Sequence, residues 1–339
     1  MQGPLARLIP RAVRRRAAAP VGRYRGARIR GRLAALAAAG RPIVAGPWLG
    51  EVGFEILYWA PFLRWFAAEY HVGPERLTVV SRGGTWSWYQ PAAGRYHDVF
   101  DYVPPDVFRQ WHEARVGEIG EQKQTRMTPR ERQLLDRVPG TEAGGAAVLH
   151  PSVMYDLLNP FWWQHLDERW VLRHARYERL PRPARPAGLH LPERYVAAKF
   201  YFNDCFPATN ENRAFVRDTL ARLARQGPVV SLAAGMAIDD HGACADPGHG
   251  VIDVAGAAPP SENLHVQSAI VAHADAFVGT YGGFAYLAPF YGVRSTSYYG
   301  DAAGFARSHL RMAHAAFAAI GAQGLLDVHP IGVRPQEFR

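Results

Sequence analysis

The stretch that decides the fold is Gly46-Pro-Trp-Leu-Gly-Glu-Val-Gly-Phe-Glu-Ile-Leu-Tyr-Trp59. It follows a short apolar segment, Pro42 to Ala45, and runs into an apolar stretch that begins at Pro61, as expected where a strand leads into a helix. The turn is rich in glycine and carries two carboxylates, Glu51 and Glu55. In open α/β sheets, ligands bind at the carboxyl ends of the strands, where such turns lie. The stretch therefore indicates either a ligand-binding turn or a tight turn with two solvated glutamates.

Segments typical of strands and helices alternate along both halves of the chain, which indicates parallel sheets with right-handed crossovers. The halves are separated by Leu180-Pro-Arg-Pro-Ala-Arg-Pro-Ala-Gly188, where three prolines and a glycine cannot continue a helix. We therefore predict an α/β fold of two Rossmann-like doubly wound domains that face a cleft. The expected parts are a flexible arginine-rich arm, an N-terminal acceptor domain, a proline-rich linker and a C-terminal donor domain, at residues 1–41, 42–180, 181–192 and 193–330.

The individual elements can be placed from the apolar pattern and from helix-start signals. Thr128-Pro-Arg-Glu131 has the pattern of a capping box with proline at the first helical position, so a helix is expected to begin there. Strands are expected at 42–46, 77–81, 99–103, 146–150, 195–202, 228–234, 250–255, 276–280 and 295–299. Helices are expected at 129–137, 156–178, 210–226, 261–273, 283–291 and 303–319.

Composition describes a globular protein. The chain has 339 residues, of which 48% are hydrophobic and 20% charged, enough for two domains that each bury a core. Its two cysteines, Cys205 and Cys244, form no disulfide framework, which suits a reducing cytoplasm. No stretch contains the 18 or more consecutive apolar residues that a membrane-spanning helix needs. We therefore expect a cytoplasmic protein, with peripheral contact to the inner face of the membrane as an option.

The net charge of +9 belongs to the N-terminal arm. Residues 1–41 contain eleven arginines and no acidic residue, so the rest of the chain carries −2. Such an arm could lie on anionic lipid, remain solvated, or contact RNA. We expect a flexible arm with weak attraction to an anionic membrane, and we do not expect a nucleic-acid partner.

A second glycine-rich turn lies in the C-terminal half. The short strand Ala276 to Gly279 leads into Thr280-Tyr-Gly-Gly283, which opens a helix. The N–H groups at a helix N-terminus attract phosphate, and glycine lets the phosphate approach the backbone. This turn predicts a phosphate site made by Thr280, Tyr281, Gly282 and Gly283. The alternative is a tight turn that needs glycine only for its own backbone angles.

Polar residues that are rare in this chain gather after the first strand of the C-terminal half. Lys199 is one of only two lysines and interrupts the apolar strand Tyr195 to Phe202. A buried ammonium must meet an anion, which could be a ligand phosphate or a structural carboxylate such as Asp204. Asn203 and Arg213 follow, and an arginine fork there suits a diphosphate, although Arg213 could equally be a surface residue. These residues complete the predicted donor site.

Weaker signals come from the N-terminal half. Trp48, Arg82, His150 and Tyr155 follow predicted strands and could bind an acceptor sugar, or could simply belong to packed loops. The acidic and histidine residues between 239 and 249 match no standard zinc spacing, so neither a metal nor a cofactor is expected. A P-loop is absent, as is a GxGxxG motif after the first strand, which argues against nucleotide hydrolysis and NAD chemistry.

The two glycine-rich segments together resemble the GT-B-fold glycosyltransferases of the heptosyltransferase type, the ADP-heptose:LPS family. Gly53-Phe-Glu55 stands where the family has Gly-Asp, with Pro61 at the family spacing. Tyr281-Gly-Gly283, Leu287-Ala-Pro289 and Gly292-Val293 follow the family's second pattern. The chain departs from it in having glutamate for aspartate, glycine for serine, arginine after Val293, and its lysine inside the strand.

The resemblance implies an inverting, metal-independent transfer of a sugar from a nucleotide donor to a hydroxyl of a glycan or glycolipid. It makes Glu55 the general base, with Glu51 as the second choice. The helix opened by Gly282 and Gly283 would hold the donor diphosphate together with Lys199. Two alternatives remain open: a sugar-nucleotide epimerase on the same fold, and a non-catalytic nucleotide- or sugar-binding protein anchored by its arm.

Overall fold

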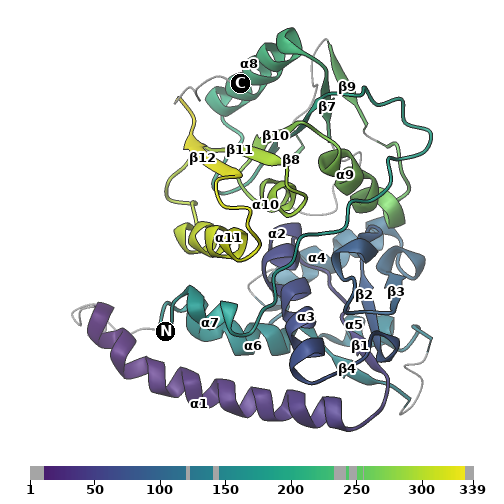
Figure 1. The fold of residues 1–339 in the computed structure, drawn as a ribbon, viewed down its shortest axis with the longest axis vertical. Coiled ribbons are helices and arrows are strands. Elements are labelled where there is room, and N and C mark those ends of the chain that lie inside the picture. The colour runs from purple at the N-terminus through teal and green to yellow at the C-terminus, as the bar shows by residue number, and fades with distance from the viewer. Residues whose placement is uncertain are drawn as a thin grey trace.

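The computed structural model describes residues 11–119, 123–139, 145–232, 242–243, 250–254 and 256–332, which form two α/β lobes in contact (Figure 1). Each lobe is built on a sheet whose strands are all parallel. The predicted fold class, two Rossmann-like α/β halves, is thereby confirmed. The proline-rich segment 181–192 connects the lobes without forming a helix or strand.

The N-terminal sheet has the strand order β3-β2-β1-β4. Its two central strands are buried throughout, because helices cover both faces of a parallel sheet. Its strands are β1 (Ile43–Ala45), β2 (Leu77–Ser81), β3 (Arg95–Asp98) and β4 (Ala147–Leu149). Its helices are α2 (Val52–Phe54), the π-helical turn η2 (Glu55–Trp59), α3 (Ala60–Glu69), η3 (Pro74–Arg76), η4 (Thr85–Trp88), η5 (Val99–Asp101), α4 (Pro105–Ile119), α5 (Pro129–Leu135), α6 (Pro151–Trp162) and α7 (Glu168–Leu172).

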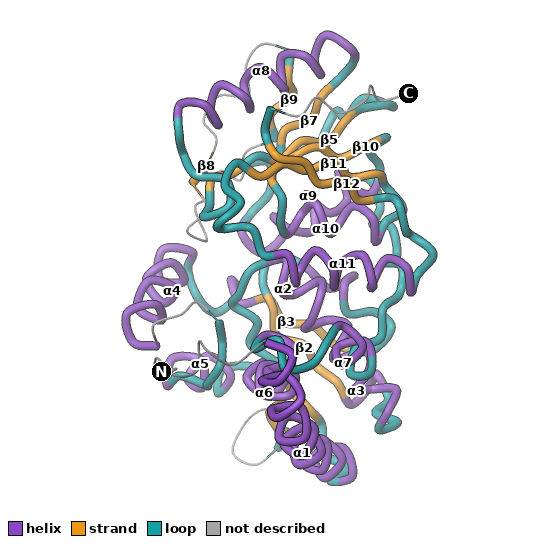
Figure 2. Tube along the Cα trace, turned by 90° about the vertical axis from the view of Figure 1, so that its left-hand side faces the viewer, coloured by secondary structure: helices purple, strands orange, loops and turns teal. Residues whose placement is uncertain are grey.

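The C-terminal sheet has the strand order β12-β11-β10-β5-β7-β9 (Figure 2). Its strands are β5 (Val196–Lys199), β7 (Val229–Ser231), β9 (Val251–Asp253), β10 (Ala276–Thr280), β11 (Arg294–Tyr299) and β12 (Leu326–Pro330). Beside it, β6 (Tyr201–Phe202) pairs antiparallel with β8 (Gly242–Ala243). Its helices are α8 (Asn210–Gln226), η6 (Pro260–Glu262), α9 (Asn263–Ala272), α10 (Gly283–Phe290) and α11 (Arg307–Ala319).

Both sheets contain a point at which the order of the strands reverses. In the N-terminal lobe the chain runs from β1 to β2 and β3, then returns to β4 on the other side of β1. In the C-terminal lobe it runs from β5 to β7 and β9, then returns to β10 on the other side of β5. Ligands of open α/β sheets bind outside the carboxyl ends of the strands at such points. The glycine-rich turns after β1 and β10 lie at these two positions.

Local sequence signals set several element boundaries. The capping box is present: Thr128 accepts from the Glu131 N–H at 3.3 Å, and Glu131 accepts from the Thr128 N–H at 2.6 Å. The strand expected at 99–103 is wrong, because β3 ends at Asp98, whose carboxylate accepts from the Phe100 N–H at 2.9 Å and starts η5. The edge strand β12 was not expected from the sequence.

The N-terminal segment differs from the expected flexible arm, because residues Arg11–Ala38 form the long helix α1. Ile29, Leu33 and Ala37 are buried against the N-terminal lobe. Two glycines allow a close approach: a Cβ at Gly22 would lie 3.0 Å from Pro160, and one at Gly26 only 2.6 Å from the Trp170 ring. Helix α1 therefore lies on α6 and α7 as a layer of the fold (Figure 1).

A histidine joins this helix to the lobe. His174 is buried between the rings of Trp65 and Trp170. Its Nδ1 donates to the Trp170 carbonyl at 2.8 Å, so its Nε2 accepts from Arg30 Nη1 at 3.2 Å in the neutral tautomer. Burial, with the nearby arginine charges, lowers the pKa of His174 to about 4.

We expect this histidine to make stability fall with acid. Between its ordinary pKa of 6.5 and about 4, the unfolded chain binds a proton that folded His174 refuses, so the free energy of unfolding decreases as pH decreases. At about 1.4 kcal/mol per pKa unit, the full effect is roughly 3 kcal/mol. The free energy of unfolding can be measured with urea between pH 4 and pH 8. Below pH 6.5 it should fall less steeply in His174→Phe than in the wild type, and as steeply as in the wild type in His314→Gln, a control on an exposed helix surface. If the wild type and His174→Phe lose stability equally as pH falls, His174 is not the cause of the acid dependence.

Candidate functional site

The two glycine-rich turns meet where the lobes touch. A Cβ at Gly283 would lie 2.9 Å from Val52 Cβ and 3.0 Å from the Gly53 N atom. A Cβ at Gly53 would in turn lie 3.3 Å from Gly283 Cα. The start of α2 and the start of α10 are therefore in backbone contact, which only glycine permits at position 283. The loops at both strand-order reversals converge on one place.

The N-terminus of α10 has the features of an anion site. Its N-cap is Gly282, whose φ of 145° favours glycine, and none of the described side chains caps the helix. The Tyr201 hydroxyl lies beside it, 2.2 Å from where a Cβ of Gly282 would stand. Gly282 and Gly283 are half-buried, whereas the preceding Thr280 and Tyr281 are buried. Of the four residues predicted for this turn, the two glycines are therefore the ones a ligand could reach.

Thr280 and Tyr281 hold the turn rather than face a ligand. Thr280 Oγ1 donates to the Tyr201 carbonyl at 2.9 Å and accepts from the Tyr201 N–H at 3.0 Å. The Tyr281 hydroxyl donates to the Ala306 carbonyl at 3.3 Å. Both side chains are buried, so direct contact of a donor with them stays a prediction.

Lys199 lies next to the first turn of α10. It is the last residue of β5, in register with Gly279 of β10. Its Nζ donates to Gln267 Oε1 at 2.5 Å and lies 4.0 Å from the centroid of the Phe284 ring. The Lys199 side chain is half-buried. The predicted cation is thus placed beside the helix N-terminus, with an amide oxygen as one partner.

The other two predicted donor residues lie on the loop and helix that follow β6. Asn203 Oδ1 accepts from the N–H groups of Cys205 at 3.0 Å and Phe206 at 2.9 Å, which fixes a turn. Arg213 is exposed, and its guanidinium lies 4.6 Å from the Phe202 ring centroid. Asn203 therefore stabilises the turn, while the Arg213 side chain is accessible to solvent.

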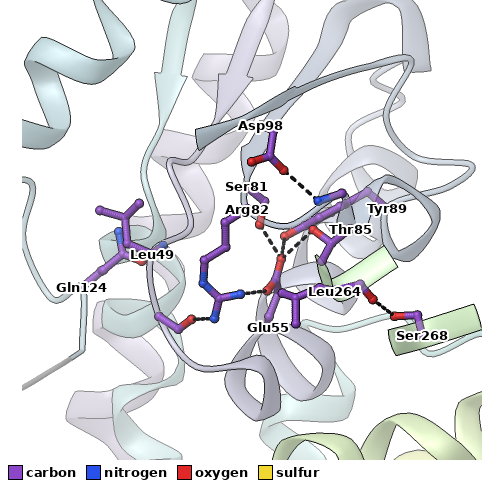
Figure 3. Close-up of polar contacts among 12 residues, drawn as sticks. Leu49, Glu55, Ser81, Arg82, Thr85, Tyr89, Asp98, Gln124, Leu264 and Ser268 are labelled. Carbon is purple, nitrogen blue, oxygen red and sulfur yellow. Dashed lines mark hydrogen bonds and ion pairs between the residues drawn. The ribbon is translucent and has the colours of Figure 1, made fainter. Parts of the chain in front are cut away.

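Glu55 occupies a sealed polar cluster beneath the first turn (Figure 3). Its Oε1 accepts from Ser81 at 2.6 Å, from Thr85 at 3.3 Å and from the Tyr89 hydroxyl. Its Oε2 pairs with Arg82 Nη1 at 3.8 Å, and its side chain is completely buried. Burial raises the pKa of Glu55, although the charge of Arg82 opposes the change. A general base must reach the proton that it removes, and Glu55 is closed off from solvent in this arrangement, so its role as the base stays a prediction.

Glu51 is the carboxylate that stands at the meeting of the lobes. It is the N-cap residue of α2, with extended backbone angles, and it is half-buried. It immediately precedes Val52, which touches Gly283. The second choice from the sequence is therefore better placed than the first.

The loop that carries Glu51 is held from two sides by buried polar side chains (Figure 3). Arg82, paired with Glu55, donates to the Gly50 carbonyl. On the other side, Gln124 donates to the Pro47 carbonyl at 2.7 Å and accepts from the Leu49 N–H at 2.8 Å. The backbone of residues 47–50 is thus fixed by an arginine and a glutamine.

Gln124 is itself anchored to a second buried carboxylate. Its Nε2 donates to Glu131 Oε1 at 2.6 Å, and the same oxygen lies 2.9 Å from Arg115 Nη2 and 3.3 Å from His150 Nε2. Burial alone would raise the pKa of Glu131, but the His150 hydrogen bond and the Arg115 charge hold it at about 2. Glu131 is therefore ionised and serves as a fixed anchor. Nothing in the local sequence near 124 predicts that Gln124 reaches Leu49 and Pro47, which are 75 and 77 residues away in the chain.

The four residues predicted to bind an acceptor are all buried. The Trp48 ring stacks on Trp59 at 5.9 Å and on Tyr155 at 6.4 Å, so it offers no face to a sugar. His150 Nδ1 accepts from the Ser152 N–H at 3.1 Å at the start of α6. Arg82 holds Gly50, as described above. These side chains lie at the predicted sheet edge, but here they pack within the fold, and their contact with an acceptor stays a prediction.

A polar contact between the lobes was missed from the sequence. Tyr58 of η2 and His309 Nδ1 of α11 are 2.6 Å apart, and Arg311 of α11 pairs with Glu168 of α7 at 2.7 Å. Burial, with the charge of Lys123, lowers the pKa of His309 to about 4, so its ring is neutral at physiological pH. Helix α11 therefore anchors the C-terminal lobe beside the first turn.

The residues considered as metal ligands, Asp239, Asp240, His241, Cys244, Asp246 and His249, lie outside the described residues. Within the described ranges, no group of three or more histidine, cysteine or acidic side chains is arranged to hold a metal ion. In the same part of the chain, no helix combines the length and apolar character needed to cross a bilayer.

No protein-family model and no curated protein matches the sequence. The structure is similar to the glycosyl transferase family 9 protein from Veillonella parvula DSM 2008, with a TM-score of 0.44 and 13% identity over 86% of each chain. It is also similar to E. coli ADP-heptose LPS heptosyltransferase II, with a TM-score of 0.44 and 13% identity over 85% of this chain and 90% of that one. A UDP-GlcNAc 2-epimerase from Methanocaldococcus jannaschii follows at a TM-score of 0.32 and 8% identity, over 76% and 82%. Similarity at this level does not transfer a function.

Proposed function

We propose that this chain is a glycosyltransferase that moves a sugar from a nucleotide-sugar donor to a hydroxyl of a glycan or glycolipid. One observation carries the proposal: the strand-order reversals of both sheets converge, with Glu51 on one side and the N-terminus of α10 on the other. A half-buried carboxylate at the start of α2, next to the contact with a helix N-terminus of the other lobe, suits a reaction that removes a proton on one side and stabilises a leaving phosphate on the other.

The donor diphosphate would bind at the start of α10. The N–H groups beyond Gly282 and the positive end of the helix dipole favour a negative charge there. Lys199 of β5, whose Nζ lies over the Phe284 ring in the first turn of α10, would add a positive charge. Arg213 lies exposed on α8 and would be available to the nucleotide. These groups belong to the chain, so the proposed reaction needs no metal ion to neutralise the diphosphate.

Glu51 would act as the general base on the acceptor side. It would take the proton of the acceptor hydroxyl as that oxygen bonds to the anomeric carbon. The bond from this carbon to the diphosphate would break on the opposite face, and the nucleoside diphosphate would leave with the electron pair. One displacement of this kind inverts the anomeric configuration. Such proton transfer contributes typically 10²–10⁴-fold to the rate.

Donor entry would require the lobes to separate. Val52 and Gly53 now lie against Gly283, where the diphosphate is proposed to bind. A rotation of the lobes about the connecting segment 181–192 would open this contact, and closure over the donor would exclude water as a competing acceptor. The Tyr58–His309 contact would lie at the edge of that movement.

The proposal is tested by nucleotide binding followed by turnover. A thermal-shift screen with UDP, GDP, ADP, CMP and dTDP should reveal one nucleotide that stabilises the protein, by about 2.7 kcal/mol at a hundred times its dissociation constant. Lys199→Met should weaken that binding, whereas Arg217→Met, on an exposed part of α8, should not.

Consumption of the matching nucleotide sugar should then depend on an added glycan or glycolipid acceptor. Isomerisation of the donor without acceptor would support the epimerase alternative. Binding with no consumption under any condition would support a non-catalytic protein. Absence of binding to all five nucleotides would overturn the proposal.

A further inference from the structure

Helix α1 presents a basic surface on the outside of the N-terminal lobe. Its 28 residues contain nine arginines and no acidic residue. One face, through Gly22, Gly26, Ile29, Leu33 and Ala37, is packed on the lobe. The side chains that point away from the lobe include exposed arginines, at positions 23, 25, 28 and 32. From Gly22 to Ala37 the helix thus lies along the lobe, while these four arginines face outward.

Exposed apolar side chains accompany this charge. Among the described residues, five large hydrophobic side chains are exposed, and four of them belong to α1 or to the ends of the two helices beneath it. Val21 and Tyr24 of α1 are 52% and 67% exposed. Trp163, directly after α6, is 61% exposed, and Leu172 ends α7 at 36%. Exposed aromatic residues are therefore concentrated in the same layer as the arginines.

This combination matches the interfacial region of a membrane. Tyrosine and tryptophan favour the level of the lipid headgroups, and arginine is attracted to anionic headgroups. A helix of 28 residues is about 42 Å long, so α1 offers an extended strip to a flat surface. One carboxylate, Asp156 of α6, lies near Arg25 and Arg32 and offsets part of their charge. Arg23 and Arg28 add further positive charge to this surface.

We infer that α1, with the exposed residues that end α6 and α7, is a docking surface for an anionic lipid bilayer. The helix lies in the plane of the headgroups, with its arginines against lipid phosphates and with Tyr24 and Trp163 inserted at the interface. The phosphates of RNA would also attract these arginines, but the exposed aliphatic side chains of Val21 and Leu172 favour lipid. The inference does not depend on the reaction proposed above.

The experiment is co-sedimentation of the full chain with vesicles. Vesicles of phosphatidylcholine mixed with anionic phosphatidylglycerol should bind the protein, and vesicles of pure phosphatidylcholine should not. Each arginine near the surface contributes roughly fivefold, so Arg23→Gln, Arg25→Gln and Arg28→Gln together should weaken binding on the order of 100-fold. The matched control replaces Arg217, Arg222 and Arg225 of α8, at the opposite end of the molecule, and should bind like the wild type (Figure 1).

A second variant separates insertion from charge. Tyr24→Ser with Trp163→Ser keeps the net charge and should still weaken binding to the anionic vesicles. Equal losses in the α1 and α8 arginine variants would overturn the proposed surface, as would absence of vesicle binding in the wild type. Salt-sensitive binding to RNA without binding to vesicles would assign the surface to nucleic acid instead.

Discussion

Glu51→Gln is expected to lower turnover of the nucleotide-sugar donor by roughly 10²–10⁴-fold while leaving nucleotide affinity nearly unchanged. The amide retains the size of the side chain and its place at the start of α2, but it cannot accept the acceptor's proton. Because Glu51 lies on the N-terminal lobe and the diphosphate is proposed to bind on α10, the two functions should separate. The change should therefore appear in kcat rather than in nucleotide binding.

The measurement is steady-state turnover with saturating acceptor, together with the thermal shift by the nucleoside diphosphate. Glu69→Gln is the matched control, because Glu69 is an exposed residue at the end of α3 in the same lobe. Turnover of Glu51→Gln equal to that of the control would remove Glu51 from the reaction. Loss of nucleotide binding in Glu51→Gln would show that the residue supports the donor site instead.

The spacing of residues in the sequence could not decide which of Glu55 and Glu51 is better placed to act as the general base. Both carboxylates follow β1 within four residues, and the distance from Glu55 to Pro61 fits the family pattern. Burial separates them: Glu51 starts the helix at the lobe contact, whereas Glu55 lies one turn further and points under the sheet edge toward Ser81. One signal was present in the sequence, because Glu55 stands in an otherwise apolar run from Val52 to Trp59. A carboxylate with buried neighbours on both sides is rarely itself buried unless it is paired, as Glu55 is with Arg82.

The sequence predicted individual helices and strands better than it predicted the contacts between them. Helix α8 occupies Asn210–Gln226 as predicted, and the capping box at Thr128 is formed, because periodicity and caps are local properties. Helix α1 was missed because the first part of its packed face is made by Gly22 and Gly26, which allow close approach but carry no apolar side chain, and only Ile29, Leu33 and Ala37 follow the helical period. The contacts of Gln124 with Pro47 and Leu49 and the support of Gly50 by Arg82 were missed, because they join segments far apart in the chain.

Removing Arg82 is expected to destabilise the protein by about 3–5 kcal/mol, the usual cost of leaving one partner of a buried ion pair alone. Glu55 Oε2 has no hydrogen-bond partner among the described residues, so Arg82 is the group that balances its charge. Arg82→Met would also release the Gly50 carbonyl and, with it, one side of the loop that carries Glu51. Urea unfolding would measure the first effect, and donor turnover the second.

The pH dependence of this loss gives a further check. Burial already raises the pKa of Glu55, and without Arg82 the pKa should rise more. A carboxyl whose pKa in the folded state lies above its unfolded value destabilises the fold as pH rises through that folded pKa. Arg82→Met should therefore cost less stability at pH 5 than at pH 8. A loss that is the same at both values would mean that Glu55 is not left charged and alone.

The double variant Arg82→Met with Glu55→Gln distinguishes packing from positioning. With no buried charge to balance, it should regain a large part of the stability that the single variant loses, and the two changes should not add. Turnover should stay low in both variants, because the Gly50 carbonyl remains unsupported and the loop that carries Glu51 is no longer fixed on that side. If the double variant regains turnover along with stability, Arg82 acts on the fold alone and the positioning of Glu51 depends on the Gln124 side of the loop.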